Sequence, residues 1–180
     1  MNYFIQCLTY FRIISGPLIF LLILITESFG LALCILILAS ASDYWDGYLA
    51  RKYQLTSRLG AILDPIADKI LITFVLIAIS LMLESLYVAF LSCIILSREY
   101  WVSALRDLNA REGNITATEV TFLAKTKTFI QLITLCVFLS GLYLNSALVI
   151  FLGNFFLLLA LIATIKTGFT YTLKTFKKHD

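Results

Sequence analysis

Long apolar stretches alternate with short polar breaks along the whole chain. Each stretch approaches about 20 residues, the length that a helix needs to cross a hydrocarbon core of about 30 Å. Because lipid offers no hydrogen bonds to an exposed backbone, such stretches cross a bilayer as α-helices. The pattern predicts an all-α polytopic membrane protein with six transmembrane helices, approximately over Tyr10–Ile25, Phe29–Ala50, Gly60–Met82, Leu86–Leu105, Val120–Tyr143 and Ser146–Thr172.

The breaks between these stretches differ in charge. Those near Glu27, Glu84 and Asn145 contain no Lys or Arg, whereas the alternate breaks and the C-terminal segment carry most of the basic residues. Basic loops stay on the cytoplasmic side of a membrane. We therefore expect both termini to be cytoplasmic, with Asp107–Glu119 as the longest cytoplasmic loop.

Composition supports a single membrane domain over residues 1–180. Of these residues 61% are hydrophobic and 14% are charged, against about 25% charged in an ordinary soluble domain. The net charge of +3 is dispersed and forms no basic stripe, so we expect no nucleic-acid partner. The four cysteines are widely spaced with no C-x-x-C pair, which argues against a thiolate metal site. We expect the first helix to be retained, because no cleavage pattern follows it.

Four aspartates interrupt the second and third apolar stretches. A charge at the centre of a membrane costs roughly 2.5–3.5 kcal/mol on insertion scales, so such acids normally face the bundle interior and serve a function. Asp43 and Asp46 are three residues apart, and Asp64 and Asp68 are four apart, so each pair shares one helical face. If the two faces meet, their carboxylates require positive charge.

Carboxylate oxygens without sulfur or imidazole nearby form a site for a hard cation, Mg²⁺ or Mn²⁺. Two ions would suit phosphodiester chemistry, because a metal pair can stabilise both the attacking and the leaving oxygen. Gly47 and Ala50 lie on the acidic face and leave room for a ligand near the backbone, and Arg51 can pair with a phosphate.

Two alternatives compete with this interpretation. Acids at a helix end can simply pair with Arg51, Arg58 or Lys69 at the membrane interface, although four acids in register make that less favoured. Intramembrane acids also line ion pathways, as in a divalent-cation transporter. The outer halves of the first, second and sixth stretches carry almost no ionisable residues, so a transporter is a remote alternative.

The aspartates belong to the pattern Asp43-x2-Asp46-Gly47-x2-Ala50-Arg51-x8-Gly60-x3-Asp64-x3-Asp68. This pattern resembles, position for position, the motif of the CDP-alcohol phosphatidyltransferases, an integral-membrane family. The resemblance implies that Asp43, Asp46 and Asp64 bind metal and that Asp68 completes the metal site and acts as the base. It also implies that the CDP group is bound by Asp46, Gly47, Ala50, Arg51 and Gly60.

Further segments resemble the branch of this family that makes phosphatidylglycerophosphate. They are Leu8-Thr9-x2-Arg12-Ile13, Ser97-Arg98-Glu99, Ser103-Ala104-Leu105-Arg106 and Lys125-Thr126-Lys127-Thr128. The resemblance implies CDP-diacylglycerol and glycerol 3-phosphate as substrates and a homodimer. A bacterial inner membrane is the simpler expectation than an organelle membrane, because no transit peptide is visible, and the basic loops place the active site on the cytoplasmic side. Cardiolipin, phosphatidylserine and phosphatidylinositol-phosphate synthases share the aspartate motif and remain alternatives.

A phosphorylated acceptor is also argued from charge. Arg98, Arg106, Lys125 and Lys127 lie near the cytoplasmic ends of the fourth and fifth stretches and could bind a second phosphate. Basic residues at these ends are equally expected from topology or from contact with anionic lipid headgroups. The residues alone leave this choice open.

Overall fold

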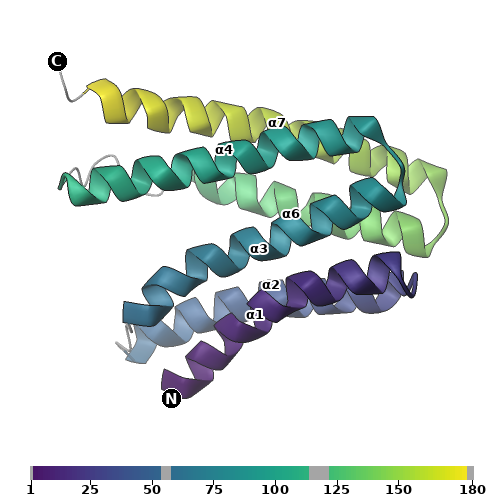
Figure 1. The fold of residues 1–180 in the computed structure, drawn as a ribbon, viewed down its shortest axis with the longest axis horizontal. Coiled ribbons are helices and arrows are strands. Elements are labelled where there is room, and N and C mark those ends of the chain that lie inside the picture. Colours follow the sequence, from purple (N-terminus) through teal and green to yellow (C-terminus); the bar gives the residue numbers. More distant parts are fainter. Residues whose placement is uncertain (1, 54–57, 114–121, 178–180) are drawn as a thin grey trace.

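The computed structural model describes the backbone of residues 2–53, 58–113 and 122–177, and the side chains of residues 7–43, 45, 63–113 and 126–177. Every described element is a helix running along the same bundle axis (Figure 1). The helices are α1 (Asn2–Leu24), α2 (Phe29–Tyr53), α3 (Arg58–Met82), α4 (Leu86–Arg111), α6 (Phe122–Tyr143) and α7 (Ala147–Phe176). The predicted all-α fold is confirmed.

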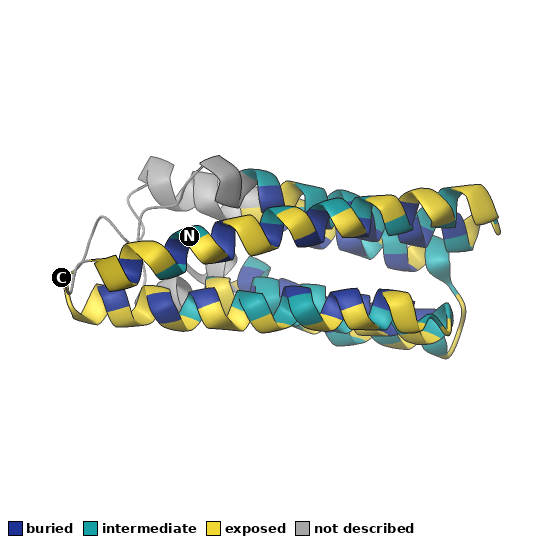
Figure 2. Cartoon of the chain, turned by 90° about the horizontal axis from the view of Figure 1, so that it is seen from above, coloured by how far each residue is buried: buried dark blue, intermediate teal, exposed yellow. Residues whose placement is uncertain are grey.

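Five of the described helices are long and apolar enough to cross a membrane, and the exception is α2. Its apolar part runs only from Phe29 to Asp43, because the acidic motif begins there. The chain changes direction between successive helices, so its two ends lie at the same end of the bundle in both views (Figures 1 and 2). Which side of a membrane this end faces stays a prediction.

Several helices are longer than their apolar stretches predict. α1 begins at Asn2 rather than near Tyr10, and α4 continues to Arg111, so the start of the predicted loop after Asp107 is helical. Hydropathy detects only the part of a helix that lies in lipid. In the last turns of α4, Arg111 pairs with Asp107 at 2.8 Å, an i, i+4 ion pair that favours continued helix.

The turns that join α1 to α2, α3 to α4 and α6 to α7 lie at the end opposite the termini (Figure 1). Glu27, Glu84 and Asn145 have φ values of 48°, 46° and 48°, the left-handed conformation that ends a helix abruptly. A serine follows each of them, and Ser85 begins α4 by accepting a hydrogen bond from the Val88 backbone N–H at 3.3 Å. These turns occur where the breaks without basic residues predicted them.

Buried positions form stripes along each helix, with exposed positions on the opposite face (Figure 2). The buried stripe is apolar at Ile19, Val75 and Phe138. The exposed face is apolar too, with Phe151 71% exposed, as expected of a surface that contacts lipid. The bundle is therefore apolar on both faces, and its polar residues stand out.

α1 and α3 approach each other closely at Gly16. A Cβ atom on Gly16 would lie 3.2 Å from the Leu71 Cα and 3.3 Å from the Ile70 carbonyl oxygen, so only glycine permits this spacing without a shift. The close approach places the turn of α1 before Gly16 directly against the acidic turns of α3. The fold thereby positions the candidate site.

Candidate active site

Arg12 is a fully buried arginine on α1 that contacts two of the predicted site aspartates. Its Nη1 atom lies 2.9 Å from Asp43 Oδ1 on α2 and 3.0 Å from Asp68 Oδ1 on α3. The two carboxylates are about half exposed, with 52% and 49% of their side-chain surfaces accessible. One guanidinium thus joins three helices beneath two acids that a ligand can reach.

Asp64 is held one turn away by a neighbouring contact. Thr9 donates a hydrogen bond from its hydroxyl to Asp64 Oδ1 at 2.9 Å. Thr9 and Arg12 are three residues apart on α1, and Asp64 and Asp68 are four apart on α3, so matching faces of the two helices meet. The prediction that the Asp64 and Asp68 face points into the bundle therefore agrees with these contacts.

Among the predicted site acids whose side chains are described, only Asp43 and Asp68 come together at one atom. Asp43 and Asp68 converge on one nitrogen, but no three acids, cysteines or histidines among the described residues form a group that could hold a metal ion. The donor chemistry, carboxylate oxygen only, fits a hard cation. Metal binding by the aspartates therefore stays a prediction. The predicted residues whose side chains lie outside the described part are Asp46, Gly47, Ala50, Arg51, Gly60 and Lys125.

The sequence indicated that Arg12 needs acidic partners, but it did not show which acids these are. An arginine within an apolar helix needs counter-charges, and Thr9 and Arg12 share a helical face. In the sequence, the segment of Thr9 and Arg12 served only as part of the resemblance to a family branch. The acids that contact it lie more than 30 residues away, so no site role was predicted for either residue. The structure adds both residues to the candidate site.

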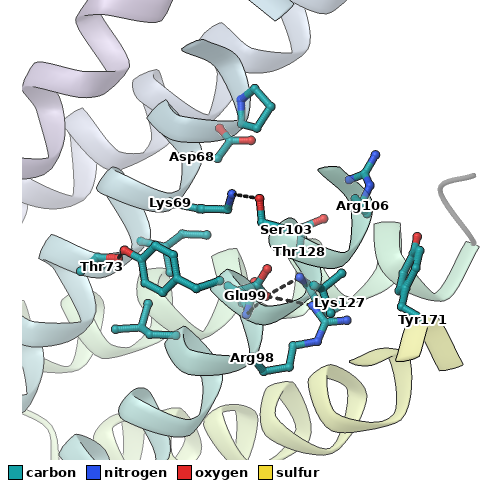
Figure 3. Close-up of a pocket in the computed structure, with 16 residues that line it drawn as sticks. Asp68, Lys69, Thr73, Arg98, Glu99, Ser103, Arg106, Lys127, Thr128 and Tyr171 are labelled. Carbon is teal, nitrogen blue, oxygen red and sulfur yellow. Dashed lines mark hydrogen bonds and ion pairs between the residues drawn. The ribbon is translucent and has the colours of Figure 1, made fainter. Parts of the chain in front are cut away.

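A polar cavity of about 240 Å³ lies on another side of Asp68, between α3, α4, α6 and α7 (Figure 3). It brings together three of the four cations predicted to bind an acceptor phosphate. Its lining includes Asp68, Arg98, Glu99, Arg106, Lys127 and Gln131. We call this cavity the polar pocket. Figure 3 shows Asp68 and Arg106 apart from each other across the pocket, with Glu99, Lys127 and Arg98 close together.

Glu99 is the acid that compensates these cations. Its Oε1 atom accepts hydrogen bonds from Lys127 Nζ, from Arg98 Nη1 at 3.4 Å and from Gln131 Nε2 at 3.3 Å. Arg98 also donates from Nη2 to the Thr167 hydroxyl on α7. Because Arg98 and Lys127 are mostly buried, this carboxylate makes their positive charge tolerable in the apolar bundle.

The path of Arg98 depends on a glycine in α7. A Cβ atom on Gly168 would lie 2.9 Å from Arg98 Nε and 3.0 Å from Arg98 Cγ, so the arginine passes over the bare backbone of α7. Glu99, Gln131 and Gly168 were not predicted as site residues. Glu99 could have been predicted as a site residue because it is an acid within an apolar helix. Nothing in the sequence around Gln131 or Gly168 indicates a role in a site.

A second cavity, of about 400 Å³, borders Asp68 from the side of α2 and α6. Its polar part consists of Asp68 itself with Arg12, Ser40, Asp43 and Thr128, and the rest is apolar. The apolar lining consists of Leu36, Leu71, Ile72, Phe129, Leu132 and Leu135. Asp68 therefore borders both a cationic pocket and a largely apolar cavity that also contains Asp43. A carboxylate in this position is suitably placed for joining a polar molecule to a lipid.

The family comparison covers most of the chain, including the aspartates of α2 and α3 that meet at Arg12. The model of the CDP-alcohol phosphatidyltransferase family matches residues 5–166, which include most of α1, the acidic motif and the lining of both cavities except Tyr171. This chain belongs to the CDP-alcohol phosphatidyltransferase family. The resemblance of its aspartate motif is thereby confirmed.

Relatives within this family share most of the chain. A protein of Rickettsia bellii (strain RML369-C) is 38% identical over 176 residues, covering 96% of this chain and 94% of the relative. One of Wigglesworthia glossinidia brevipalpis is 39% identical over 132 residues, and one of Escherichia coli (strain K12) is 35% identical over 131, covering 72% and 71% of both chains, respectively. All three are named CDP-diacylglycerol–glycerol-3-phosphate 3-phosphatidyltransferase.

Replacing Arg12 tests the joint between α1, α2 and α3. We expect Arg12→Met to lower the free energy of unfolding by about 2 kcal/mol, because Asp43 and Asp68 lose their shared counter-charge. The loss is smaller than for a fully buried pair, since both carboxylates are half exposed. Denaturant titration of the detergent-solubilised protein in EDTA measures it.

Arg111→Met is the matched control. Arg111 pairs with Asp107, but both side chains are largely exposed, so its loss should cost less than about 1 kcal/mol. Equal stabilities for the two variants would show that Arg12 does not join the three helices.

Proposed function

We propose that this protein transfers the phosphatidyl group of CDP-diacylglycerol to glycerol 3-phosphate, giving phosphatidylglycerophosphate and CMP. The observation that carries the proposal is the position of Asp68 between the polar pocket and the apolar cavity. The names of the relatives support the same reaction. Within the family, a phosphorylated acceptor suits a pocket lined by Arg98, Arg106 and Lys127 better than an uncharged one does.

The donor lipid would occupy the apolar cavity with its diphosphate near the aspartates. Asp43, Asp46, Asp64 and Asp68 would hold one or two Mg²⁺ or Mn²⁺ ions, and Asp46, Gly47, Ala50, Arg51 and Gly60 would bind the CDP group. Bound there, the metal would neutralise charge on the diphosphate. Support comes from the all-carboxylate donor set and from the convergence of Asp43 and Asp68.

The acceptor would enter the polar pocket with its phosphate toward the cations. Arg98, Arg106 and Lys127 line this pocket, and Lys125 would assist from the same helix as Lys127. Arginine forks suit phosphate oxygens, and lysine adds a point charge. This arrangement leaves the acceptor hydroxyl facing Asp68, where a base must lie within about 2.6–3.2 Å of the hydroxyl oxygen.

The reaction is then a single displacement at phosphorus. Asp68 takes the proton of the acceptor hydroxyl, and the acceptor oxygen forms a bond to the phosphorus that carries diacylglycerol. The bond from that phosphorus to the bridging oxygen of CDP breaks, and CMP leaves with the electron pair. Binding both substrates beside one carboxylate makes the attack effectively intramolecular.

The setting we propose is the bacterial inner membrane, with the site facing the cytoplasm and the protein acting as a homodimer. The cationic ends of α4 and α6 lie toward the end of the bundle that carries the termini. Basic residues at that end favour the cytoplasmic side, where a water-soluble phosphorylated acceptor is available.

An acceptor scan tests the proposed function. Purified protein with CDP-diacylglycerol and Mg²⁺ should release CMP with glycerol 3-phosphate at least about 100-fold faster than with serine or phosphatidylglycerol, because the buried cations of the polar pocket require a phosphate monoester. Release of CMP is measured by chromatography. Faster turnover with serine, with phosphatidylglycerol or with inositol phosphate would reassign the protein within its family.

Asp68→Asn tests the base. The variant retains the shape of Asp68 and an oxygen for Arg12, but it cannot accept the proton, so we expect kcat to fall by about 10³-fold or more. The protein should remain folded, as judged by its thermal unfolding in detergent. Asp107→Asn on the exposed end of α4 is the control and should keep full activity. Wild-type turnover by Asp68→Asn would refute the assignment.

A further inference from the structure

We propose that Gln131 recognises the hydroxyl group of the acceptor that does not react, so that the polar pocket selects a phosphorylated diol over a phosphorylated simple alcohol. The inference rests on the proposed function, in which the acceptor is glycerol 3-phosphate. It assigns a specificity role to a residue outside the motif that carries the chemistry. Its basis is a buried hydrogen-bond acceptor for which the described residues provide no partner.

Gln131 lies on α6 at the wall of the polar pocket and is 4% exposed. Its Nε2 atom donates to Glu99 Oε1 at 3.3 Å. Its Oε1 atom is buried and has no hydrogen-bond partner within the described part of the chain. Buried polar atoms are normally paired, so an unpaired one on a residue of the pocket wall indicates a missing partner, which reaches it once the side chain turns toward the pocket.

The orientation of the Gln131 amide follows from its neighbour. Glu99 Oε1 also accepts hydrogen bonds from the cationic groups of Lys127 and Arg98, so it acts as an acceptor toward Gln131 as well. Turning the amide over would place two oxygens against each other. The amide nitrogen therefore faces Glu99, and the carbonyl oxygen remains as an acceptor for something else.

An acceptor atom restricts what that partner can be. The oxygens of a phosphate dianion are acceptors and would be repelled by Gln131 Oε1 and by Glu99, whereas a hydroxyl group can donate to Oε1. Arg98, Arg106 and Lys127 offer the donors that a phosphate needs. Once Gln131 turns its Oε1 atom toward the polar pocket, the pocket offers donors for phosphate and an acceptor for a hydroxyl group.

Glycerol 3-phosphate has a group for each part of this pocket. Its phosphate would contact the cations, its terminal hydroxyl would face Asp68, and its middle hydroxyl would donate to Gln131 Oε1. An ordered water molecule could satisfy the same atom. A water that merely fills the space would serve acceptors with and without the middle hydroxyl equally, so the two explanations differ in substrate preference.

The experiment compares glycerol 3-phosphate with 3-hydroxypropyl phosphate, which lacks only the middle hydroxyl. With wild-type protein, CDP-diacylglycerol and Mg²⁺, we expect kcat/KM to be about 10- to 100-fold higher for glycerol 3-phosphate, since the analogue leaves Gln131 Oε1 unpaired. In Gln131→Met, which keeps the size but not the hydrogen bond, this ratio should fall to within about 3-fold of unity.

Thr134→Val is the matched control. Thr134 lies one turn further along α6, is equally buried, and donates to its own helix at the Ile130 carbonyl oxygen. It does not line the polar pocket, so the variant should keep the wild-type preference for glycerol 3-phosphate. Thermal unfolding in detergent verifies that both variants are folded.

Three outcomes would overturn the inference in different ways. A wild-type ratio near unity would show that the middle hydroxyl is not recognised, and this result needs no variant. Equal losses with both acceptors in Gln131→Met would mean that Gln131 only orients Glu99. No CMP release from wild-type protein with glycerol 3-phosphate would overturn the proposed function first.

Discussion

The candidate site depends on how a bundle that is apolar inside and out accommodates ionised groups. Arg12 is fully buried on α1, and it is tolerated because Asp43 and Asp68 reach its Nη1 atom from α2 and α3. Gly16 permits this contact by allowing the backbones of α1 and α3 to approach closely. The same ion pairs that satisfy Arg12 hold two acids of different helices side by side.

In the polar pocket, too, a buried ion is compensated by opposite charges from more than one helix, but here the central ion is an acid. Here Glu99 is the central ion, and Arg98 and Lys127 approach it from α4 and α6. Asp68 borders both this pocket and the apolar cavity that contains Arg12. Compensating buried charge has therefore produced two neighbouring cavities that share Asp68, of which the polar pocket has the more cationic lining. This arrangement suits transfer from a lipid to a polar acceptor.

The sequence was sufficient for features that depend on one helix at a time. Helix length and hydropathy gave the helices and their turns, and spacing placed Asp64 and Asp68 on one face. Contacts between helices could not be predicted from the sequence, because residue spacing shows which residues share a helical face but not which residues of another helix lie opposite that face. Arg12, Glu99 and Gln131 therefore acquired roles only when their partners on other helices were known. The predicted start of the loop at Asp107 was wrong, because α4 continues to Arg111 and hydropathy does not detect helix outside lipid.

The central claim is that Asp43 and Asp68 cooperate at one cation-binding site. Binding of Mn²⁺ to the purified protein, measured by the loss of free-ion signal in electron paramagnetic resonance, tests it most directly. We expect the wild-type protein to bind Mn²⁺, and Asp43→Asn and Asp68→Asn each to weaken binding by about 10-fold or more, with Asp107→Asn unchanged. Undiminished Mn²⁺ binding in both aspartate variants would contradict the account.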